Sequence, residues 1–457
     1  MPPNESRYFR KNFLLGIATG ASINLGMALL DPLTILPVFV SKLGGSAAMV
    51  GLVSALHGIG WFLPQILASR LAETRRYLIN LYRTLTTVRA IALSGVVLCV
   101  FFIDSRELGL FLTVFVSSLF LAHLAGGLSA IPFLEITSKT IPVTIRGKFF
   151  GTRRLIGGIV GILAGVVVGM VLDEHSERVY MDWAIFDFVE SVIRRAGLLG
   201  HEFPINYGIL FLFGWFFMTL GGVIFGFASE EPAEKVETSA RILDTFRSGM
   251  RLFRTDSNYR RFFWARTLWQ FTAMAFPFYV GFAYQDLGLS DNLVGLFLSV
   301  WIGAGVFSNY FWGKLLDRKG NRIVFQLTAA GSIIPPVVVL VLDRFAQPAA
   351  GADSGWLLAI MCGTFFVNGF IRSGRIISNI TYLLEFAPAD KRPLYVGFMN
   401  TFSFPFMLTP LLGGVLLQMT GTTVLFGASL LFALANMVIC LRLPEPREVV
   451  RPDEMMT

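Results

Sequence analysis

Long apolar runs dominate this chain, and their length limits the folds that it can adopt. A helix needs about 20 apolar residues to cross the hydrocarbon core of a bilayer. Twelve runs qualify, over residues 13–40, 48–69, 78–103, 108–136, 150–172, 206–228, 263–285, 291–314, 322–342, 356–383, 395–418 and 421–442. They are far longer than the roughly ten-residue strand of a membrane barrel, and polar and apolar residues do not alternate in them. The sequence therefore predicts an all-α integral membrane protein with twelve transmembrane helices.

Charged residues are scarce, which supports the membrane assignment. Of the 457 residues, 54% are hydrophobic and 15% are charged, whereas roughly 25% are charged in an ordinary soluble domain. Cys99, Cys362 and Cys440 lie in apolar runs, and their spacing fits neither a metal site nor a disulfide framework. The sequence also contains no phosphate-binding loop. We therefore expect no enzyme activity, no cofactor and no metal.

The two halves of the chain share a spaced motif. Proline, arginine and glycine recur at one constant offset, first in Pro142-Val143-Thr144-Ile145-Arg146 with Gly151, then in Pro388-Ala389-Asp390-Lys391-Arg392 with Gly397. A hydrophobic chain built from two related halves is typical of a secondary transporter. The repeat predicts two related halves, residues 1–228 and 262–443, joined by a connection over 229–261 and followed by a tail over 444–457.

The distribution of basic residues predicts the orientation in the membrane. An even number of spans places both termini on one side, and most of the 38 lysines and arginines fall on that side. The other side carries Lys42, Arg106, Arg178, Arg194, Arg195 and Arg344. Positive residues stay in the cytoplasm, so we expect both termini on the cytoplasmic side of the cell membrane. The net charge of +8 is then an orientation signal, and no nucleic-acid partner is expected.

Two connections are long enough to carry structure of their own. The cytoplasmic connection 229–261 separates basic and apolar residues at helical spacing, which suits an amphipathic helix on the anionic inner leaflet. The insertion 173–205, on the outer side, shows two stripes of the same kind. It predicts an interfacial or cap-like helix, which either anchors the protein or contacts a solute.

A loop motif resembles the signature of the major facilitator superfamily. The segment Gly313-Lys314-Leu315-Leu316-Asp317-Arg318-Lys319-Gly320-Asn321-Arg322 is similar to the family pattern between the second and third helices of a six-helix half. The matching residues are Gly313, Asp317, Arg318, Gly320 and Arg322. In the first half Leu71 replaces the expected aspartate, and only Arg75 and Arg76 persist.

The resemblance implies a mechanism as well as a fold. It implies that the motif is a conformational gate, whose charged contacts form and break as the protein changes state. It also implies two pseudo-symmetric six-helix bundles, which rock about a central cavity lined by the first and fourth helices of each half. Because the first-half aspartate is missing, the two halves are not expected to use identical gate contacts.

Two titratable residues in the first half are candidates for proton coupling or substrate binding. Asp31 lies well inside the first span, where a carboxylate is costly and usually serves a pathway. Because Pro32 follows it, Asp31 is alternatively the N-cap of the next helical segment. His123 lies in the fourth span, where many proton-coupled members of the superfamily carry an arginine. A histidine in an ordinary environment titrates near neutral pH, so His123 is expected to take over that role; alternatively it forms a structural hydrogen bond to a neighbouring helix.

The second half offers polar candidates of its own. Arg372 and Asn368 share the tenth span, and Gln270 lies in the seventh. Arg372 can bind a carboxylate or phosphate, or alternatively its side chain extends to the headgroups.

Four glycines recur at every fourth position of the fifth span: Gly157, Gly161, Gly165 and Gly169. Such a stripe predicts close helix packing. It is also similar to the glycine-rich motif of efflux antiporters in the superfamily, although the proline of that motif is absent.

These observations predict a secondary active transporter, monomeric in the membrane, that moves a small organic molecule by alternating access. We expect proton-coupled efflux or antiport, with Asp31 as the proton carrier and His123 assisting. Its partners would be a small-molecule solute, protons or another coupling ion, and membrane lipid. One alternative is an uptake symporter or facilitator for an organic anion, with Arg372 as counter-charge. A second is a non-transporting receptor or scaffold on the same fold.

Overall fold

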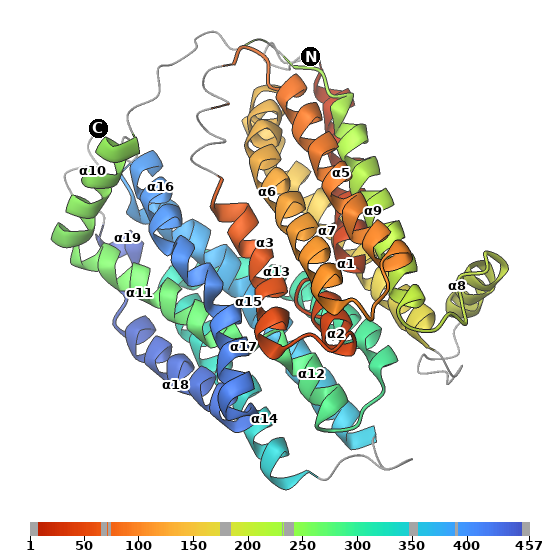
Figure 1. Cartoon of the computed structure of the whole chain (residues 1–457). Helices are drawn as coiled ribbons and strands as arrows, with labels where there is room; N and C mark the ends of the chain where they lie inside the picture. The colour runs from red at the N-terminus through yellow and green to blue at the C-terminus, as the bar shows by residue number, and fades with distance from the viewer. Residues whose placement is uncertain are drawn as a thin grey trace. The chain divides into compact units, whose positions relative to one another are not determined.

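A computed structural model describes residues 8–64, 71, 75–173, 184–230, 232, 242–346, 355–388 and 392–449. These residues form helices and loops without a strand, as Figure 1 shows. The chain divides into two compact units: the first comprises residues 1–239 and 289–299, and the second comprises residues 240–288 and 300–457. The all-α fold predicted from the sequence is confirmed.

The first unit consists mainly of long helices. They are α1 (Phe9–Leu29), α2 (Ile35–Lys42), α3 (Ala47–Phe62), α5 (Ile79–Phe102), α6 (Leu108–Thr140), α7 (Val143–Leu172), α8 (Ala184–Arg195) and α9 (Ile205–Gly226), with the short turn η2 (Asp291–Leu293). α1 packs along α7 and α9, and α5 lies between α6 and α9. The amphipathic α8 lies beside this bundle in Figure 1.

The second unit contains more broken helices. They are α10 (Ile242–Thr255), α11 (Ser257–Thr272), η1 (Ala273–Ala275), α12 (Phe278–Gln285), α14 (Ile334–Phe345), α15 (Gly355–Phe386), α16 (Arg392–Ser403), η4 (Phe404–Leu408), α17 (Thr409–Thr420), α18 (Thr422–Leu441) and α19 (Pro446–Val449). The helix α13 (Val294–Gly331) starts in the first unit and continues in the second. α18 packs against α11, α14 and α17.

The observed helices agree with the predicted spans in length and order. In the described part of the chain, nine helices are long and apolar enough to cross a membrane. One of them, Val294–Phe345, covers two predicted spans, because α13 and α14 follow each other closely. Two further predicted spans correspond to the shorter apolar helix α3 and to α11–η1–α12. Prolines account for the breaks in three spans: Pro32, Pro277 and Pro405.

The glycine stripe of α7 contacts two other segments of the first unit. A Cβ atom at Gly157 would lie 2.6 Å from the Asn24 amide nitrogen on α1. A Cβ at Gly165 would overlap the Ser299 hydroxyl and lie 2.6 Å from the Gly295 carbonyl oxygen. Ser299 also donates a hydrogen bond to the carbonyl of Ile162, 3.0 Å away. Small residues thus allow the start of α13 to pack directly on the α7 backbone.

A carboxylate that follows the last long helix of the first unit caps the start of α5. Glu230 Oε2 accepts hydrogen bonds from the backbone nitrogens of Leu78 (2.6 Å) and Ile79 (2.9 Å), and its Oε1 lies 3.0 Å from Lys139 Nζ. Nearby, the Asn12 amide donates to the Ser229 carbonyl at 2.7 Å. The start and the end of this bundle therefore meet at one face.

The second unit repeats this arrangement at the gate motif. Gly320 interrupts α13 with φ of +79°, a conformation that glycine adopts without strain. The helix resumes after it, and Glu445 accepts hydrogen bonds from the backbone nitrogens of Asn321 (3.2 Å) and Arg322 (2.8 Å). A Cβ at Gly320 would lie 2.5 Å from the Glu445 carboxylate. Glycine at this position is therefore required by the cap.

The remaining motif residues lie mostly at the surface. Asp317 and Arg318 are exposed, as are Arg75 and Arg76 of the first half, and Gly313 has open space where a side chain would be. Arg447 donates to the Asp317 carbonyl at 3.3 Å and pairs with Glu385 at 3.0 Å. Hydrogen bonding to Glu385 raises the pKa of Arg447. The gate role of these residues stays a prediction.

The sequence predicts that the amphipathic helix of the connection places its apolar face in lipid. In the structure this face packs on protein. Met250, Leu252 and Phe253 of α10 pack against the core of the second unit. The Phe253 ring lies 5.2 Å from the Phe263 ring and 5.3 Å from the Phe402 ring. The protein itself therefore covers this apolar face. Residues 231 and 233–241 of the connection, 174–183 of the insertion and 450–457 of the tail lie outside the described residues.

The packing of Gly165 leads to a stability prediction. Gly165→Ala should lower the free energy of unfolding in detergent micelles by about 1–3 kcal/mol, because its methyl group must displace backbone atoms of another helix. Gly151→Ala is the matched control, since a Cβ there meets open space. The control should be neutral or slightly stabilising. Equal unfolding curves for the two variants would contradict the packing shown here.

Candidate functional site

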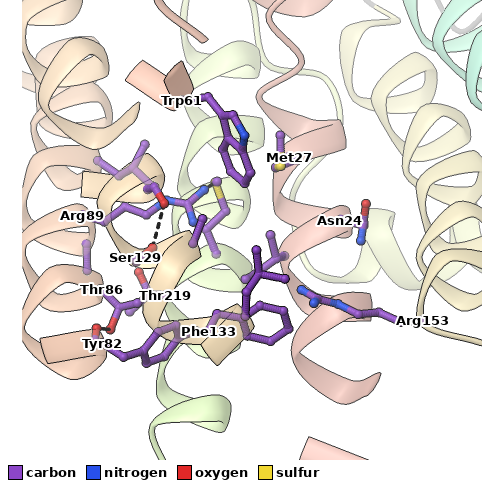
Figure 2. Close-up of a pocket in the computed structure, with 18 of the residues that line it drawn as sticks. Asn24, Met27, Trp61, Tyr82, Thr86, Arg89, Ser129, Phe133, Arg153 and Thr219 are labelled. Atoms are coloured by element: carbon purple, nitrogen blue, oxygen red, sulfur yellow. Dashed lines mark hydrogen bonds between the residues drawn. The ribbon is translucent and has the colours of Figure 1, made fainter. Parts of the chain in front are cut away.

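A cavity in the first unit has a volume of about 340 Å³, within the usual range of roughly 300–1,000 Å³ for small-molecule sites. Its walls come from α1, α3, α5, α6, α7 and α9. The polar and aromatic lining residues are Asn24, Trp61, Tyr82, Thr86, Arg89, Ser129, Phe133, Phe150, Arg153 and Thr219. Figure 2 shows most of these side chains turned toward one space.

Arg89 enters the cavity from the middle of α5. Its guanidinium packs against the α6 backbone at Gly126, where an added Cβ would lie 3.5 Å from the guanidinium carbon. Among the described residues, its hydrogen-bond acceptor is the sulfur of Met218, 3.9 Å away. A thioether is a weak acceptor. The donors of Arg89 are therefore largely unsatisfied by the protein.

Arg153 reaches the same cavity from α7, on the opposite side in Figure 2. Its guanidinium carbon lies 4.2 Å from the centre of the Phe133 ring, a cation–π contact. Its stem packs against Gly20 of α1, where a side chain would overlap it. No hydrogen bond joins the Arg153 guanidinium to any residue in the described ranges.

Neutral polar groups complete the lining, and several are already hydrogen-bonded. The Asn24 amide donates to the Gly20 carbonyl at 2.7 Å, and the Ser129 hydroxyl donates to the Gly126 carbonyl at 2.8 Å. Trp61 is 43% exposed at the cavity edge. Neither aspartate nor glutamate occurs among the described lining residues. The fixed charge of this cavity is therefore positive.

A second, much smaller cavity adjoins the first and contains two histidines. His57 and His123 lie edge to face, with ring centres 5.2 Å apart. Arg89 and Met218 line both cavities. His123 Nε2 is buried and has no hydrogen-bond partner in the part of the chain that the structure describes. The arginine that the fourth span lacks is thus supplied beside His123 by α5.

Asp31 occupies the break between α1 and α2. Its Oδ1 accepts hydrogen bonds from the backbone nitrogens of Leu33 and Thr34 and from the Thr34 hydroxyl, each at 2.9 Å. Its neighbours Leu30 and Pro32 line the histidine cavity. The carboxylate thus caps the turn between the two helices, whereas the N-cap residue of α2 itself is Thr34 and not Asp31 as the sequence alternative had it. A proton-carrying role for Asp31 stays a prediction.

The candidates of the second half lie on α11 and α15, where Asn368 and Arg372 are one helical turn apart. The Arg372 guanidinium lies 5.5 Å from the Trp301 ring centre. The Gln270 amide donates to the sulfur of Met407 at 3.0 Å. Asn368 is 1% exposed. Their functional roles stay predictions.

The structure thus adds Arg89 and Arg153 to the candidates. Both lie inside predicted spans, 78–103 and 150–172. The signal that selected Asp31, an ionisable residue inside an apolar span, applies equally to them. The orientation argument assigned Arg89 and Arg153 to the basic residues of the cytoplasmic side. They were therefore not recognised as residues of a site. In the described ranges, no group of three or more histidine, cysteine, aspartate or glutamate residues could hold a metal ion.

Sequence comparison identifies relatives over parts of the chain. Residues 262–456 match the family model described as Major Facilitator Superfamily. The multidrug resistance protein MdtG of Proteus mirabilis is 28% identical over 160 residues, which are 33% of this chain and 34% of MdtG. The ectoine/proline transporter ProP of Corynebacterium glutamicum is 26% identical over 136 residues, which are 30% of this chain and 22% of ProP. The chain thus aligns with about a third or less of either relative.

The fold is shared over nearly the whole chain. The crystal structure of a D-xylose-proton symporter superposes with a TM-score of 0.67 at 13% identity, covering 96% of this chain and 99% of that chain. Residues 262–456 thus match the Major Facilitator Superfamily, and the fold of nearly the whole chain is similar to that of this symporter. Several described helices are long and apolar enough to cross a membrane, as in a multi-pass membrane protein.

The cap at Asp31 leads to a prediction about stability. Asp31→Ala should lower the free energy of unfolding by about 1 kcal/mol, because two backbone donors lose their acceptor. Asp31→Asn retains an oxygen at the same position and should lose less. Unfolding of both variants in one detergent would measure the difference. If Asp31→Ala were as stable as the unmodified protein, the carboxylate would not be needed as a cap.

Proposed function

We propose that this protein is a proton-coupled secondary active transporter that moves a small organic solute by alternating access. The solute would bind in the 340 Å³ cavity of the first unit. The family supports transport, and the cavity supports a small ligand, because it combines aromatic walls with a few inward-facing polar groups.

The observation that carries the coupling is the position of Arg89 between two cavities. It lines the solute cavity on one side and the cavity of His57 and His123 on the other. A proton on either histidine places a positive charge beside Arg89. Proton binding and solute binding therefore act on each other through electrostatics, which is the requirement for energetic coupling.

The direction of transport has two candidates. Export or antiport is supported by the partial similarity to MdtG, named as a multidrug resistance protein, and by the glycine stripe of α7. Uptake of an organic anion together with protons is supported by the cavity itself, because a bound anion would favour a proton on the neighbouring histidines. We expect the protein in the cell membrane with both termini in the cytoplasm, acting as a monomer.

Flux in proteoliposomes tests the proposal. Compounds would first be selected by thermal shift of the purified protein, since a ligand of the folded state raises its apparent stability. An imposed pH gradient should drive accumulation of a selected compound, and reversing the gradient should reverse the flux. Inward flux with protons indicates symport, and outward flux against them indicates antiport. A folded, ligand-binding protein that moves none of these compounds would instead be a receptor or scaffold.

Variants of the histidines test the coupling. His123→Gln and His57→Gln should lose gradient-driven accumulation while retaining exchange of labelled for unlabelled compound, because exchange needs no net proton movement. His201→Gln is the matched control, since His201 bonds to the Gly197 carbonyl at 2.9 Å and lines neither cavity. Asp31→Asn belongs in the same series. If His123→Gln, His57→Gln and Asp31→Asn all retained full accumulation, none of these groups would be needed for proton coupling.

A further inference from the structure

The cavity of the first unit contains two cations without counter-charges. Arg89 and Arg153 both line it, and the described lining residues of this cavity and of the histidine cavity include no carboxylate. An arginine within a membrane-spanning helix is costly and is normally paired. A buried cation without a partner is more costly still. The described residues that line these two cavities therefore do not supply the counter-charge.

The hydrogen-bond donors of both guanidiniums are available to a ligand. Among the described residues, Arg89 has only the Met218 sulfur as an acceptor, 3.9 Å away, and Arg153 rests on the Phe133 ring without a hydrogen bond. A guanidinium presents its donors in a planar fork that matches carboxylate, sulfonate and phosphate oxygens. Two guanidiniums whose donors face one space can bind an anionic group together.

The packing holds the two guanidiniums in place without occupying their donors. Gly126 lets Arg89 lie on the α6 backbone, and Gly20 lets the stem of Arg153 lie on α1. Phe133 supports the face of the Arg153 guanidinium, 4.2 Å from its ring centre. Because these supports are apolar or backbone contacts, the two cations are positioned before a ligand arrives. Such preorganisation lowers the entropic cost of binding.

The rest of the cavity fits an apolar body rather than a small inorganic ion. Trp61 and Phe133 face each other across the space between the two arginines (Figure 2). Met27, Leu93 and Phe150 add further apolar surface. A volume of about 340 Å³ exceeds what phosphate or chloride would fill. The ligand therefore needs an aromatic or aliphatic portion beside its charge.

We infer that the solute is an amphipathic organic anion: a small aromatic or branched aliphatic body that carries a carboxylate, sulfonate or phosphate. Arg89 and Arg153 bind the anionic group, and Trp61 and Phe133 contact the body. This inference rests on the proposed function, whose solute class it supplies. It also places recognition of the charge on α5 and α7, whereas the sequence had suggested Arg372 of α15.

Calorimetry with a charge series tests the inference on the unmodified protein. The full chain in phosphatidylcholine nanodiscs would be titrated with 2-naphthoate, 2-naphthamide and 2-naphthylmethylammonium, which share a ring system and differ in charge. We expect naphthoate to bind at least about tenfold more tightly than the amide, and the ammonium compound not to bind. Equal affinity for the acid and the amide, or preference for the ammonium, would overturn the inference.

Substitutions then assign the charge recognition to residues. Arg89→Gln and Arg153→Gln should each weaken naphthoate binding at least about tenfold, because each removes a charge-assisted hydrogen bond. Arg89→Lys and Arg153→Lys should retain more affinity, since they keep the charge and lose the fork. Arg154→Gln is the matched control: it is the adjacent arginine of α7, is exposed, and lines neither cavity. Unchanged affinity in both glutamine variants would overturn the assignment.

Two further measurements separate the remaining explanations. Ligand-free melting of each variant shows whether it folds, and the charge series stands without the variants if one does not. Nanodiscs that also contain phosphatidylglycerol test a lipid headgroup as the anion. Competition of this lipid with naphthoate would assign the arginines to lipid and overturn the solute inference. Naphthoate binding without flux would refute the proposed transport but support the anion site. Flux of uncharged compounds alone would support transport but refute the anion site.

Discussion

The structure depends on the need of every backbone polar group for a partner in an environment without water. Helices meet this need within themselves, but each start, end and break exposes donors or acceptors. In this protein carboxylates satisfy several of these exposed donors. Asp31 caps the break after α1, Glu230 caps α5, and Glu445 caps the second segment of α13. The few acidic side chains near the helices are thus used largely to complete the fold.

This use of the acids explains the charge of the cavity. Because Asp31 and Glu230 are engaged at helix ends, neither pairs with the arginines that line the centre of the first unit. Arg89 and Arg153 remain as cations held by glycine backbone, a thioether and an aromatic ring. Their desolvation is not offset within the described protein. The inference that an anionic ligand completes this site rests on this balance of charge.

Sequence reasoning predicted the all-α membrane fold because a span is defined by length and apolarity, both of which are local. It also recognised the capping geometry of Asp31, since a carboxylate before proline is a local signal. It did not find the cavity, because uniformly apolar spans give no periodicity to show which face of α5 carries Arg89. For the same reason it assigned the apolar face of α10 to lipid, although Phe253 packs on Phe263. Such contacts depend on which helices become neighbours, which no single span encodes.

The positions of the two arginines on separate helices have a mechanical consequence. α5 packs on α6 and α9, and α7 packs on α1 and α9. An anion shared by Arg89 and Arg153 would join α5 and α7 directly through its own oxygens. The empty first unit would then be the more compliant one, and the loaded unit would move as a stiffer body. In that case ligand binding would make the whole bundle more rigid without changing the shape of any helix.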